Sequence, residues 1–584
     1  MHSLSGANSD GASAVAKRAA LIAGLCLGVA MPALADVYNI PNGDVAALAA
    51  AIDDANMSAG PHTINLAAGG SYTLVASLPD ITVNGLVING NGATINGDDS
   101  FRVFFIDLGA DVGLNNVNMT NGFGGVAGGA IFNSGTLSML DCVITSSAAG
   151  ANGGGIFNDG TLLVTDCAIN GNASDDGAGI FTSGGIVIIS GGEISGNTAF
   201  GNGGGAIYNN LGDVTVSGGA VLDDNEATQG GAIVNDGTLT ITDSTIHANA
   251  SEGLGGGILS FSGTILIEAS TLSHNTADSA GGGVTVLDGT VYLINSTVSG
   301  NASALFGGGV LSVATVNVLN STIVLNSAGA SGGGIAILGG DTTTHNTIIG
   351  GNDVLGTPDE VSGSLDASSS FNILADASTS GGTTDSVNGN QVGVNLALTI
   401  DLTLGNNGGP TMTHALFPCG PAMDMGDPLL AASLTFDQRG SGFTRISGVS
   451  VDIGAVEFQQ NAEFQGLVPL FWGSGVGKFF WPATGYTTTQ LVSDVFGPAY
   501  PGSHGGLTLH QAVKFTGPPT APYAEKSLLR QGVAALLNAG HPDINYALTE
   551  SQVIQLVRTA LDSGDSQIML DAWALLLYYN AQGL

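Results

Sequence analysis

Basic residues are scarce in this sequence. The chain of 584 residues has 10 Lys and Arg against 47 Asp and Glu, which gives a formal net charge of −37. Arg102 is the only basic residue between Asp36 and Gln438. A surface this acidic repels nucleic acids, anionic membranes and polyuronates, and it attracts cations. We therefore expect no nucleic-acid partner; the acidity otherwise serves either general cation binding or solubility alone.

Long apolar runs are missing after the N-terminus, although 43% of the residues are hydrophobic. No later stretch approaches the roughly 18 apolar residues of a membrane span, so the apolar side chains are expected in a soluble core. At the N-terminus, Lys17 and Arg18 precede the apolar run 19–30, and an A-x-A motif ends at Ala35. This pattern predicts a signal peptide over residues 1–35, and hence a secreted or cell-surface protein with no transmembrane span after cleavage.

Glycine, in contrast, is abundant, with 93 residues, and much of it stands in a repeated phrase. "GGAIFNSGTLSMLDCVITSS" begins at Gly128, and "GGGIFNDGTLLVTDCAINGN" begins 25 residues later. A fixed period in this range indicates a repeat architecture. The aliphatic residue after the glycines recurs in steps of 24 to 27 residues, at Ile131, Ile156, Ile180, Ile207, Ile233, Ile258, Val284, Val310 and Ile335.

Within one repeat, apolar and polar residues alternate. In "GTLTITDSTIHAN", Leu239 and Ile241 share one face and the threonines share the other, which is the pattern of a strand. Two or three short strands per repeat, with no helix between them, predict one coil of a parallel β-helix. Asp44 is placed to N-cap a helix with an apolar stripe that includes Leu48 and Ile52, which would cover the first coil.

Two further columns follow the repeat. An Asn recurs at steps of 24 to 28 residues and predicts a structural ladder of stacked amides at one bend; its members are Asn172, Asn197, Asn225, Asn249, Asn275, Asn301, Asn326 and Asn352. Cys142 and Cys167 occupy the position that Ser244, Ser270, Ser296 and Ser321 take in later coils. Adjacent coils lie about 4.8 Å apart, which permits a disulfide, whereas in-register stacking orients the two Cβ atoms unfavourably. The sequence therefore does not decide whether the two cysteines form a disulfide.

The repeats carry a family resemblance. The "GGAI" or "GGGI" phrase paired with "SGN" resembles the repeats of chlamydial-type polymorphic outer membrane proteins and related bacterial β-helix proteins. "GPAMDMGDP", "FDQRGSGFTR" and "VDIGAVEF" resemble the choice-of-anchor Q module, which closes such β-helices. The resemblance covers roughly residues 36–458. It implies a right-handed parallel β-helix on a bacterial surface or in the medium, and it implies no catalytic residue.

The composition changes near Leu467. Three helical segments follow, one of them opening with a capping box formed by Thr549 and Gln552. This region resembles an uncharacterised C-terminal module of bacterial secreted proteins. The fold class expected is therefore all-β, a right-handed parallel β-helix with an N-terminal capping helix and a small C-terminal α-helical domain. The expected divisions are a signal peptide (1–35), an N-terminal cap (36–62), the β-helix (63–415), a closing module and linker (416–466) and the helical domain (467–584).

Catalytic groups are hard to find in the repeats. A uronate lyase needs a base and either a cation or a metal at the substrate carboxylate, and Arg102 is the only basic residue in the coils. A hydrolase needs two carboxylates, which the turn residues Asp175, Asp176, Asp223 and Asp224 offer. The same four aspartates are the candidate Ca²⁺ ligands, although no EF-hand or nonapeptide calcium repeat is present. His247 and His274 stand at different offsets from the Asn column and are not expected to stack into a metal site.

The sequence thus favours an exported, non-catalytic protein that acts in adhesion or in contact with a carbohydrate or a surface. No catalytic residue and no cofactor are assigned, apart from the Ca²⁺ option. The alternative is a hydrolase or lyase that degrades polysaccharide on the same fold. An extracellular surface or a polysaccharide is the expected partner, and the oligomeric state and the ligand's identity stay open.

Overall fold

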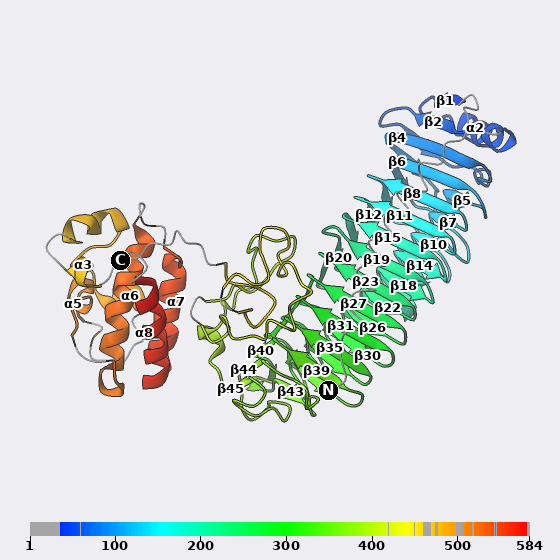
Figure 1. Cartoon of the computed structure of the whole chain (residues 1–584). Coiled ribbons are helices and arrows are strands. Elements are labelled where there is room, and N and C mark those ends of the chain that lie inside the picture. Colours follow the sequence, from blue (N-terminus) through cyan, green and yellow to red (C-terminus); the bar gives the residue numbers. More distant parts are fainter. Residues whose placement is uncertain are drawn as a thin grey trace.

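The computed structural model describes residues 36–58, 60–417, 420–448, 450–459, 469–473, 477–497, 504, 506–516, 519–541, 544 and 546–580. The expected signal peptide and most of the expected linker after Gln459 lie outside these residues. The described part forms a parallel β-solenoid of about 13 turns, followed by a helical domain (Figure 1). None of its helices is long and apolar enough to cross a membrane.

Each coil contributes its first two strands to one large sheet, sheet A, because a two-residue bend separates them without breaking the stack. At this bend one residue takes a positive φ, as Asp243 (51°) and Asn295 (47°) do, a conformation that Asp and Asn tolerate better than most residues. Among the described residues sheet A has 25 strands. They are β1 (Val37–Ile40), β2 (His62–Leu66), β3 (Ser71–Thr73), β4 (Asn84–Asn96), β6 (Asp111–Thr120), β8 (Thr136–Leu140), β9 (Val143–Thr145), β11 (Thr161–Thr165), β12 (Ala168–Asn170), β15 (Ile186–Ser190), β16 (Glu193–Ser195), β19 (Asp213–Ser217), β20 (Val221–Asp223), β23 (Thr238–Thr242), β24 (Thr245–His247), β27 (Thr264–Glu268), β28 (Thr271–Ser273), β31 (Thr290–Ile294), β32 (Thr297–Ser299), β35 (Thr315–Leu319), β36 (Thr322–Val324), β39 (Thr342–His345), β40 (Ile348–Gly350), β44 (Ile373–Leu374) and β45 (Gln391–Val392).

Two smaller sheets complete the coil. Sheet B holds 11 strands and sheet C holds 9 within the described ranges. Sheet B consists of β5 (Phe104–Ile106), β7 (Ile131–Asn133), β10 (Ile156–Asn158), β14 (Ile180–Ser183), β18 (Ile207–Asn210), β22 (Ile233–Asn235), β26 (Ile258–Ser260), β30 (Val284–Val286), β34 (Val310–Ser312), β38 (Ile335–Ile337) and β43 (Val361–Ser362). Sheet C consists of β13 (Ala173–Asp176), β17 (Thr198–Gly203), β21 (Glu226–Ala227), β25 (Ala250–Ser251), β29 (Thr276–Ala277), β33 (Ala302–Ser303), β37 (Ser327–Ala328), β41 (Asp353–Val354) and β42 (Thr357–Pro358).

The aliphatic column after the glycines is confirmed as a stack inside the solenoid. Ile156 pairs in register with Ile131 on one side and Ile180 on the other, and the pairing continues in parallel to Ile335. Every member of the column is buried. The alternation within each strand therefore reports a face turned inward to a continuous apolar core.

The N-terminal cap is also confirmed. Helix α2 (Val45–Met57) begins at Asp44, whose Oδ1 accepts a hydrogen bond from the Ala47 amide at 2.9 Å. Its buried face includes Leu48 and Ile52, which join the core of the solenoid. The helix covers an end of the stack that would otherwise expose apolar side chains to water.

The Asn column forms the predicted ladder. Each side-chain Nδ2 donates to the Oδ1 of the Asn in the next coil at 2.9 to 3.0 Å, from Asn172 through to Asn352. The backbone amide of each Asn donates to the same Oδ1. All members are buried. Each side-chain amide therefore supplies the hydrogen-bond partner of a backbone amide that water does not reach.

Glu360 ends this ladder. Its buried carboxylate accepts hydrogen bonds from the backbone amides of Gly351 (3.0 Å) and Asn352 (3.2 Å) and from Asn352 Nδ2 (2.7 Å). A carboxylate suits this position because it accepts several bonds and requires no further acceptor. Burial nevertheless raises the pKa of Glu360 to about 7.

The shifted pKa of Glu360 makes the ladder's end sensitive to pH. Between about pH 4.5 and pH 7 the folded state retains a proton that the unfolded chain has released, so the free energy of unfolding falls as the pH rises. We expect the stability advantage of the wild type over Glu360→Gln to shrink by up to about 3 kcal/mol across this window. Urea denaturation of both proteins at several pH values measures it.

The comparison with the variant is needed because buried histidines act in the opposite direction. Burial lowers the pKa of His345 and of His414, so their contributions to stability grow as the pH rises towards 6.5. These contributions are the same in both proteins and cancel in the difference. A difference that stays constant or grows with pH would contradict the role given to Glu360.

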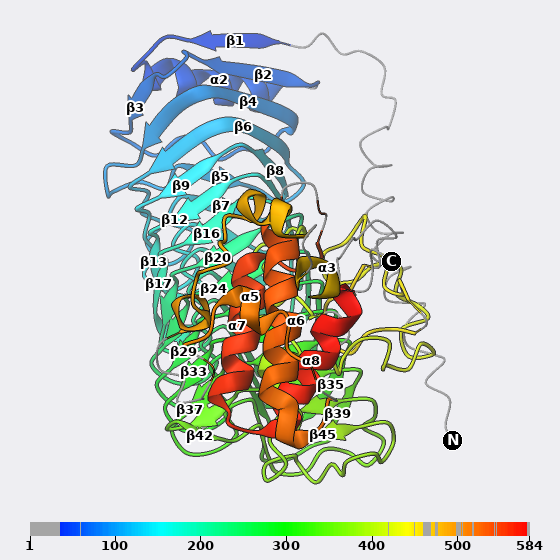
Figure 2. The same ribbon diagram turned by 90° about the vertical axis from the view of Figure 1, so that its left-hand side faces the viewer.

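The C-terminal domain is helical, as expected. Its main helices are α6 (Ala524–Gly540), α7 (Glu550–Asp562) and α8 (Ser566–Asn580), which stand side by side in Figure 2. The predicted capping box of α7 is present, with Thr549 and Gln552 each accepting the other's backbone amide. Shorter elements complete it: α3 (Pro469–Gly473), η2 (Gly477–Thr484), α4 (Val492–Phe496), α5 (Leu509–Ala512) and η3 (Ala521–Tyr523).

The helical domain has its own core, which also reaches the segment before it. The apolar stripes of α6 and α7 supply much of it, and Trp573 of α8 packs at its margin; the stripe residues are Leu529, Val533, Leu536, Val553, Leu556 and Val557. Leu398, in η1 (Leu396–Leu398), and Phe417 are buried in the same cluster. The last paired strand of the solenoid is β45, so Leu398 and Phe417 both follow the coils in the chain.

Candidate functional site

The four aspartates singled out from the sequence do not form one site. Asp175 and Asp176 lie on β13 in sheet C, whereas Asp223 ends β20 in sheet A, two coils further along, and Asp224 follows it. The carboxylate of Asp176 accepts hydrogen bonds from the backbone and side-chain amides of Asn202. No cluster of three or more His, Cys, Asp or Glu side chains suited to a metal occurs in the described part of the chain.

The two histidines lie in adjacent coils and touch. The rings of His247 and His274 make an edge-to-face contact, with centroids 5.2 Å apart. The contact is between ring edge and ring face, and the pair is not part of a metal-holding cluster among the described residues. His247 Nδ1 lies 3.0 Å from Ser273 Oγ, and burial lowers the pKa of His274, so the pair is held in the wall of the solenoid.

Cys142 and Cys167 are buried free thiols in adjacent coils. The backbone amide of Cys142 lies 3.3 Å from Cys167 Sγ, and the serines of later coils make the corresponding bond, as from Ser244 N to Ser270 Oγ at 3.2 Å. The column thus supplies an acceptor for one backbone amide per coil. In the structure the two cysteines fill this role as thiols.

Arg102 is fully engaged in holding the backbone. Its guanidinium donates to the carbonyls of Gly124, Ala127 and Gly128 at 2.7 to 2.9 Å, and it lies over the Phe105 and Phe132 rings. These carbonyls belong to the glycine-rich stretch 122–129. The one basic residue of the coils therefore braces a bend.

The Phe rings beneath Arg102 begin an aromatic column on the outer face of sheet B. Successive rings stack at centroid distances of 4.6 to 5.7 Å. Because the faces of the three inner rings are covered by their neighbours, the column presents mainly ring edges to a ligand. The members are Phe105, Phe132, Phe157, Phe181 and Tyr208.

After the last coil the chain turns back along the outside of the solenoid. We call residues 396–459 the closing segment; it is the yellow part of Figure 1, which lies against the later coils. It covers the outer face of β28, β32 and β36, where every residue is buried, whereas β12 leaves its outward residues partly exposed. The segment is therefore a flap on the side of the rod as well as a terminus for it.

Gln438 is the main anchor of the closing segment. Its side chain accepts from Thr297 Oγ1 at 2.6 Å and donates to Thr271 Oγ1 at 2.9 Å, so it connects two coils. His414 Nε2 adds a contact with Ser299 Oγ at 2.9 Å. The outward threonines and serines of these coils thus serve as attachment points.

The charged residues of the closing motifs form a buried cluster that we call the closing knot. Arg445 is completely buried; it donates to the carbonyls of Asp452 and Gly454 at 2.6 and 2.9 Å, and lies 3.9 Å from Glu457. The Glu457 carboxylate in turn accepts the backbone amides of Ser447 and Asp452. These motif residues thus maintain the conformation of the flap. Burial raises the pKa values of both Asp452 and Glu457.

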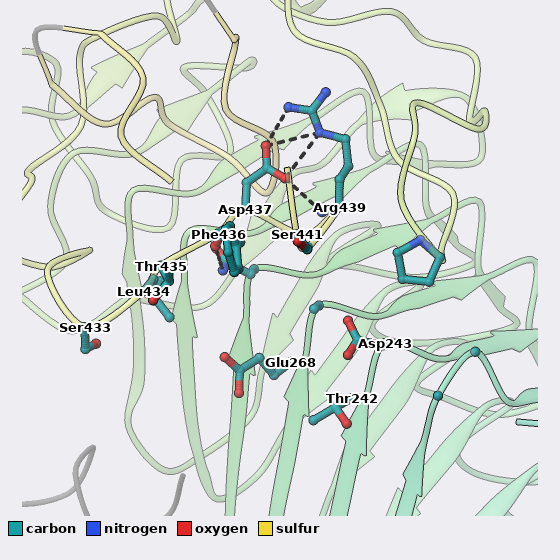
Figure 3. A pocket seen from close by; sticks show the side chains of 16 residues that line it. Thr242, Asp243, Glu268, Ser433, Leu434, Thr435, Phe436, Asp437, Arg439 and Ser441 are labelled. Atoms are coloured by element: carbon teal, nitrogen blue, oxygen red, sulfur yellow. Dashed lines mark hydrogen bonds and ion pairs between the residues drawn. The ribbon is translucent and has the colours of Figure 1, made fainter. Parts of the chain in front are cut away.

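A cavity of about 720 Å³ lies where the closing segment overhangs the solenoid (Figure 3). Its floor is the bend between the two strands that each coil gives to sheet A, from Gly218 and Gly219 through Asp243 and Ala269 to Asn295. At one end of the floor, Gly218 and Gly219 carry no side chain that would fill the cavity. This volume falls in the range of ordinary small-molecule sites.

The opposite wall is residues 433–441 of the closing segment, together with Pro410. It presents hydroxyl groups and one aromatic ring, that of Phe436, which is 37% exposed. The Phe436 carbonyl accepts a hydrogen bond from Asn295 Nδ2 at 2.9 Å, which ties this wall to the floor. Together with the bonds from Gln438 to Ser270 and Thr271, this contact fixes the wall to the solenoid at several points.

Two carboxyl groups stand on the solenoid side of the cavity, as Figure 3 shows for Asp243 and Glu268. They belong to adjacent coils, since Glu268 pairs in register with Thr242. Burial raises the pKa of both groups, and the neighbouring Asp243 adds to the shift of Glu268. On the opposite wall Asp437 is paired with Arg439, whose Nη2 lies 2.6 Å from Asp437 Oδ2.

Sequence reasoning missed this site, because it requires the flap to return over coils about 140 to 170 residues earlier in the chain. One signal was present. The residue that ends the first strand of each coil is apolar or neutral from Leu140 to Leu319 except at Glu268, whose neighbours in the column are Thr242 and Ile294. A single acidic residue in an otherwise uncharged column indicates that this coil has a role the others do not share.

Comparisons of this chain with protein-family models, with curated proteins and with solved structures find no match.

Proposed function

We propose that this protein is an exported, non-catalytic β-helix protein of the cell surface or the surrounding medium, and that it binds carbohydrate in the cavity under its closing segment. The observation that carries the proposal is the composition of that cavity. An exposed aromatic ring is combined with hydroxyl and carboxyl groups, which suits a ligand with an apolar ring face and many hydroxyls. The signal-peptide pattern and the resemblance to surface β-helix repeats support the location.

The proposal excludes uronate elimination at this cavity on chemical grounds. That reaction needs a base and a cation at the substrate carboxylate. Arg439 is the basic residue on the described cavity wall, and its guanidinium is bound to Asp437 and to the Glu457 carbonyl. An acidic polysaccharide would also meet two uncompensated carboxyl groups, so a neutral or cationic glycan suits the site better.

Hydrolysis is the second candidate function, because the cavity contains a pair of carboxyl groups. Burial raises the pKa of Glu268, as a general acid requires, and Asp243 is the neighbouring group. These residues replace the turn aspartates named from the sequence as the pair to test. A hydrolase would lose turnover on Glu268→Gln.

Phe436 provides the sharpest test of carbohydrate binding. We expect Phe436→Ala to weaken the binding of the oligosaccharide that the wild type prefers by at least tenfold, since the ring supplies the apolar platform of the site. Phe123→Ala is the matched control; this ring is similarly exposed (43%) but lies in an early coil, and its loss should leave binding unchanged.

The measurement is isothermal titration of the purified mature protein with neutral, acidic and amino oligosaccharides, with and without calcium. Released reducing and unsaturated ends are assayed in parallel. Binding without turnover is the expected result. Turnover that disappears in Glu268→Gln would establish the hydrolase instead, and failure of every glycan to bind would reject the proposal.

A further inference from the structure

The cavity under the closing segment carries an excess of negative charge. Asp243 and Glu268 line it from the solenoid, and Asp437 and Arg439 line it from the flap. Arg439 and Asp437 neutralise each other through a bidentate contact, with Nε 3.1 Å and Nη2 2.6 Å from Asp437 Oδ2 and Nε 3.2 Å from Oδ1. The two solenoid carboxyl groups consequently have no cation among the described cavity residues.

The solenoid floor of the cavity also has a hydrogen-bond acceptor without a partner among the described residues. Asn295 lines the cavity and is only 3% exposed; its Nδ2 is bound to the Phe436 carbonyl, but its Oδ1 accepts no hydrogen bond from any described residue. Asn295 is one coil beyond Glu268, which is itself one coil beyond Asp243. Three neighbouring coils thus place carboxylate or amide oxygens along the cavity floor, whereas Arg439, bound to Asp437, is the cationic residue among the described lining residues.

We propose that the cavity selects glycans that carry free, protonated amino groups, such as oligomers of unacetylated amino sugars. This inference rests on the proposed carbohydrate-binding function and names its ligand class. An ammonium group supplies three donors and a positive charge, so it satisfies the carboxylates through charge-assisted hydrogen bonds. A neutral sugar leaves both carboxylates desolvated without a counter-charge, and a uronate adds a third negative charge.

The test uses three probes of equal length on the full mature protein near pH 6: glucosamine tetramer, its fully N-acetylated form and cellotetraose. We expect the glucosamine tetramer to bind at least tenfold more tightly than the other two. Glu268→Gln and Asp243→Asn should each reduce this preference to less than about threefold, because each removes a charged partner of the ammonium group and lessens the penalty paid by the acetylated tetramer. Asp224→Asn, an exposed carboxylate in the neighbouring coil, is the matched control and should keep the full preference.

Each alternative outcome is distinguishable. Equal affinity for the acetylated and unacetylated tetramers would overturn this inference and leave carbohydrate binding intact, whereas no binding of any tetramer would overturn both. Calcium chloride alone is the fourth probe: binding of Ca²⁺ that is lost in both carboxyl variants would identify a metal site and overturn the inference. Thermal unfolding of each variant verifies that the flap is folded, and Asp243→Asn decides the question if Glu268→Gln is unfolded.

Discussion

Replacing Asn275 by Leu is expected to destabilise the solenoid by about 3 kcal/mol. Asn275 Oδ1 accepts both the backbone amide of Asn249 (3.0 Å) and its Nδ2 (2.9 Å), and Asn275 Nδ2 donates to Asn301 Oδ1. Leucine fills a similar volume but leaves the buried Asn249 amide without an acceptor. The cost arises from that unpaired amide, since water does not reach the bend.

A second ladder, which is partly exposed, provides the control. Asn89 Nδ2 donates to Asn65 Oδ1 at 2.9 Å, and Asn89 Oδ1 accepts from Asn115 Nδ2 at 3.0 Å, on the outer face of sheet A. The bonds are of the same kind, but water can replace them there, so Asn89→Ala should cost less than about 1 kcal/mol. Urea denaturation of both variants measures the contrast. Equal losses would show that the ladder's contribution does not depend on its burial.

Replacing Arg445 by Met is expected to release the closing segment from the solenoid. The side chain keeps a similar length but loses its charge and its bonds to the carbonyls of Asp452 and Gly454, next to the buried carboxylate of Glu457. Removing one partner from a buried charge cluster typically costs about 3 to 5 kcal/mol, because the remaining groups stay desolvated. We expect this loss to be confined to the flap, with the coils still folded.

Limited proteolysis and circular dichroism distinguish this local release from general unfolding. In Arg445→Met, cleavage within residues 396–459 should become rapid while the β-sheet signal persists, and glycan binding should be lost together with the flap. Lys514→Met removes an exposed positive charge in the helical domain and should change neither. Wild-type protease resistance in Arg445→Met would show that the closing knot does not hold the flap.

The periodic features of this protein could be predicted from the sequence, because each repeat places the same residue in the same environment. The column through Ile131 and Ile335 and the ladder through Asn172 and Asn352 follow from steps of about 25 residues. A second buried amide contact, from Asn133 to Asn158 at 2.6 Å, escaped notice because Thr182 interrupts its column. Columns that recur in every coil can thus be predicted from the sequence, whereas a column interrupted by a different residue is harder to recognise.

The cavity depends on contacts that no local pattern encodes. Thr297 resembles the other threonines of its column until Gln438 returns to bind it, 141 residues later in the chain. The polar residues of the closing motifs, such as Asp437 and Arg445, were visible as a motif, but only the folded flap shows that they are buried and engaged with one another. The turn aspartates were conspicuous in sequence for the opposite reason: turns favour Asp whether or not a ligand is present.

The central claim is that glycan binds between the bend of the solenoid and the flap that covers it. Hydrogen–deuterium exchange of the mature protein, with and without a saturating glucosamine tetramer, tests this claim most directly. The account predicts slower exchange in three separate stretches, residues 433–441 of the closing segment and residues 242–244 and 268–270 of the bends, with the aromatic column of sheet B unchanged. Protection confined to sheet B or to the helical domain, with neither cavity wall affected, would contradict it.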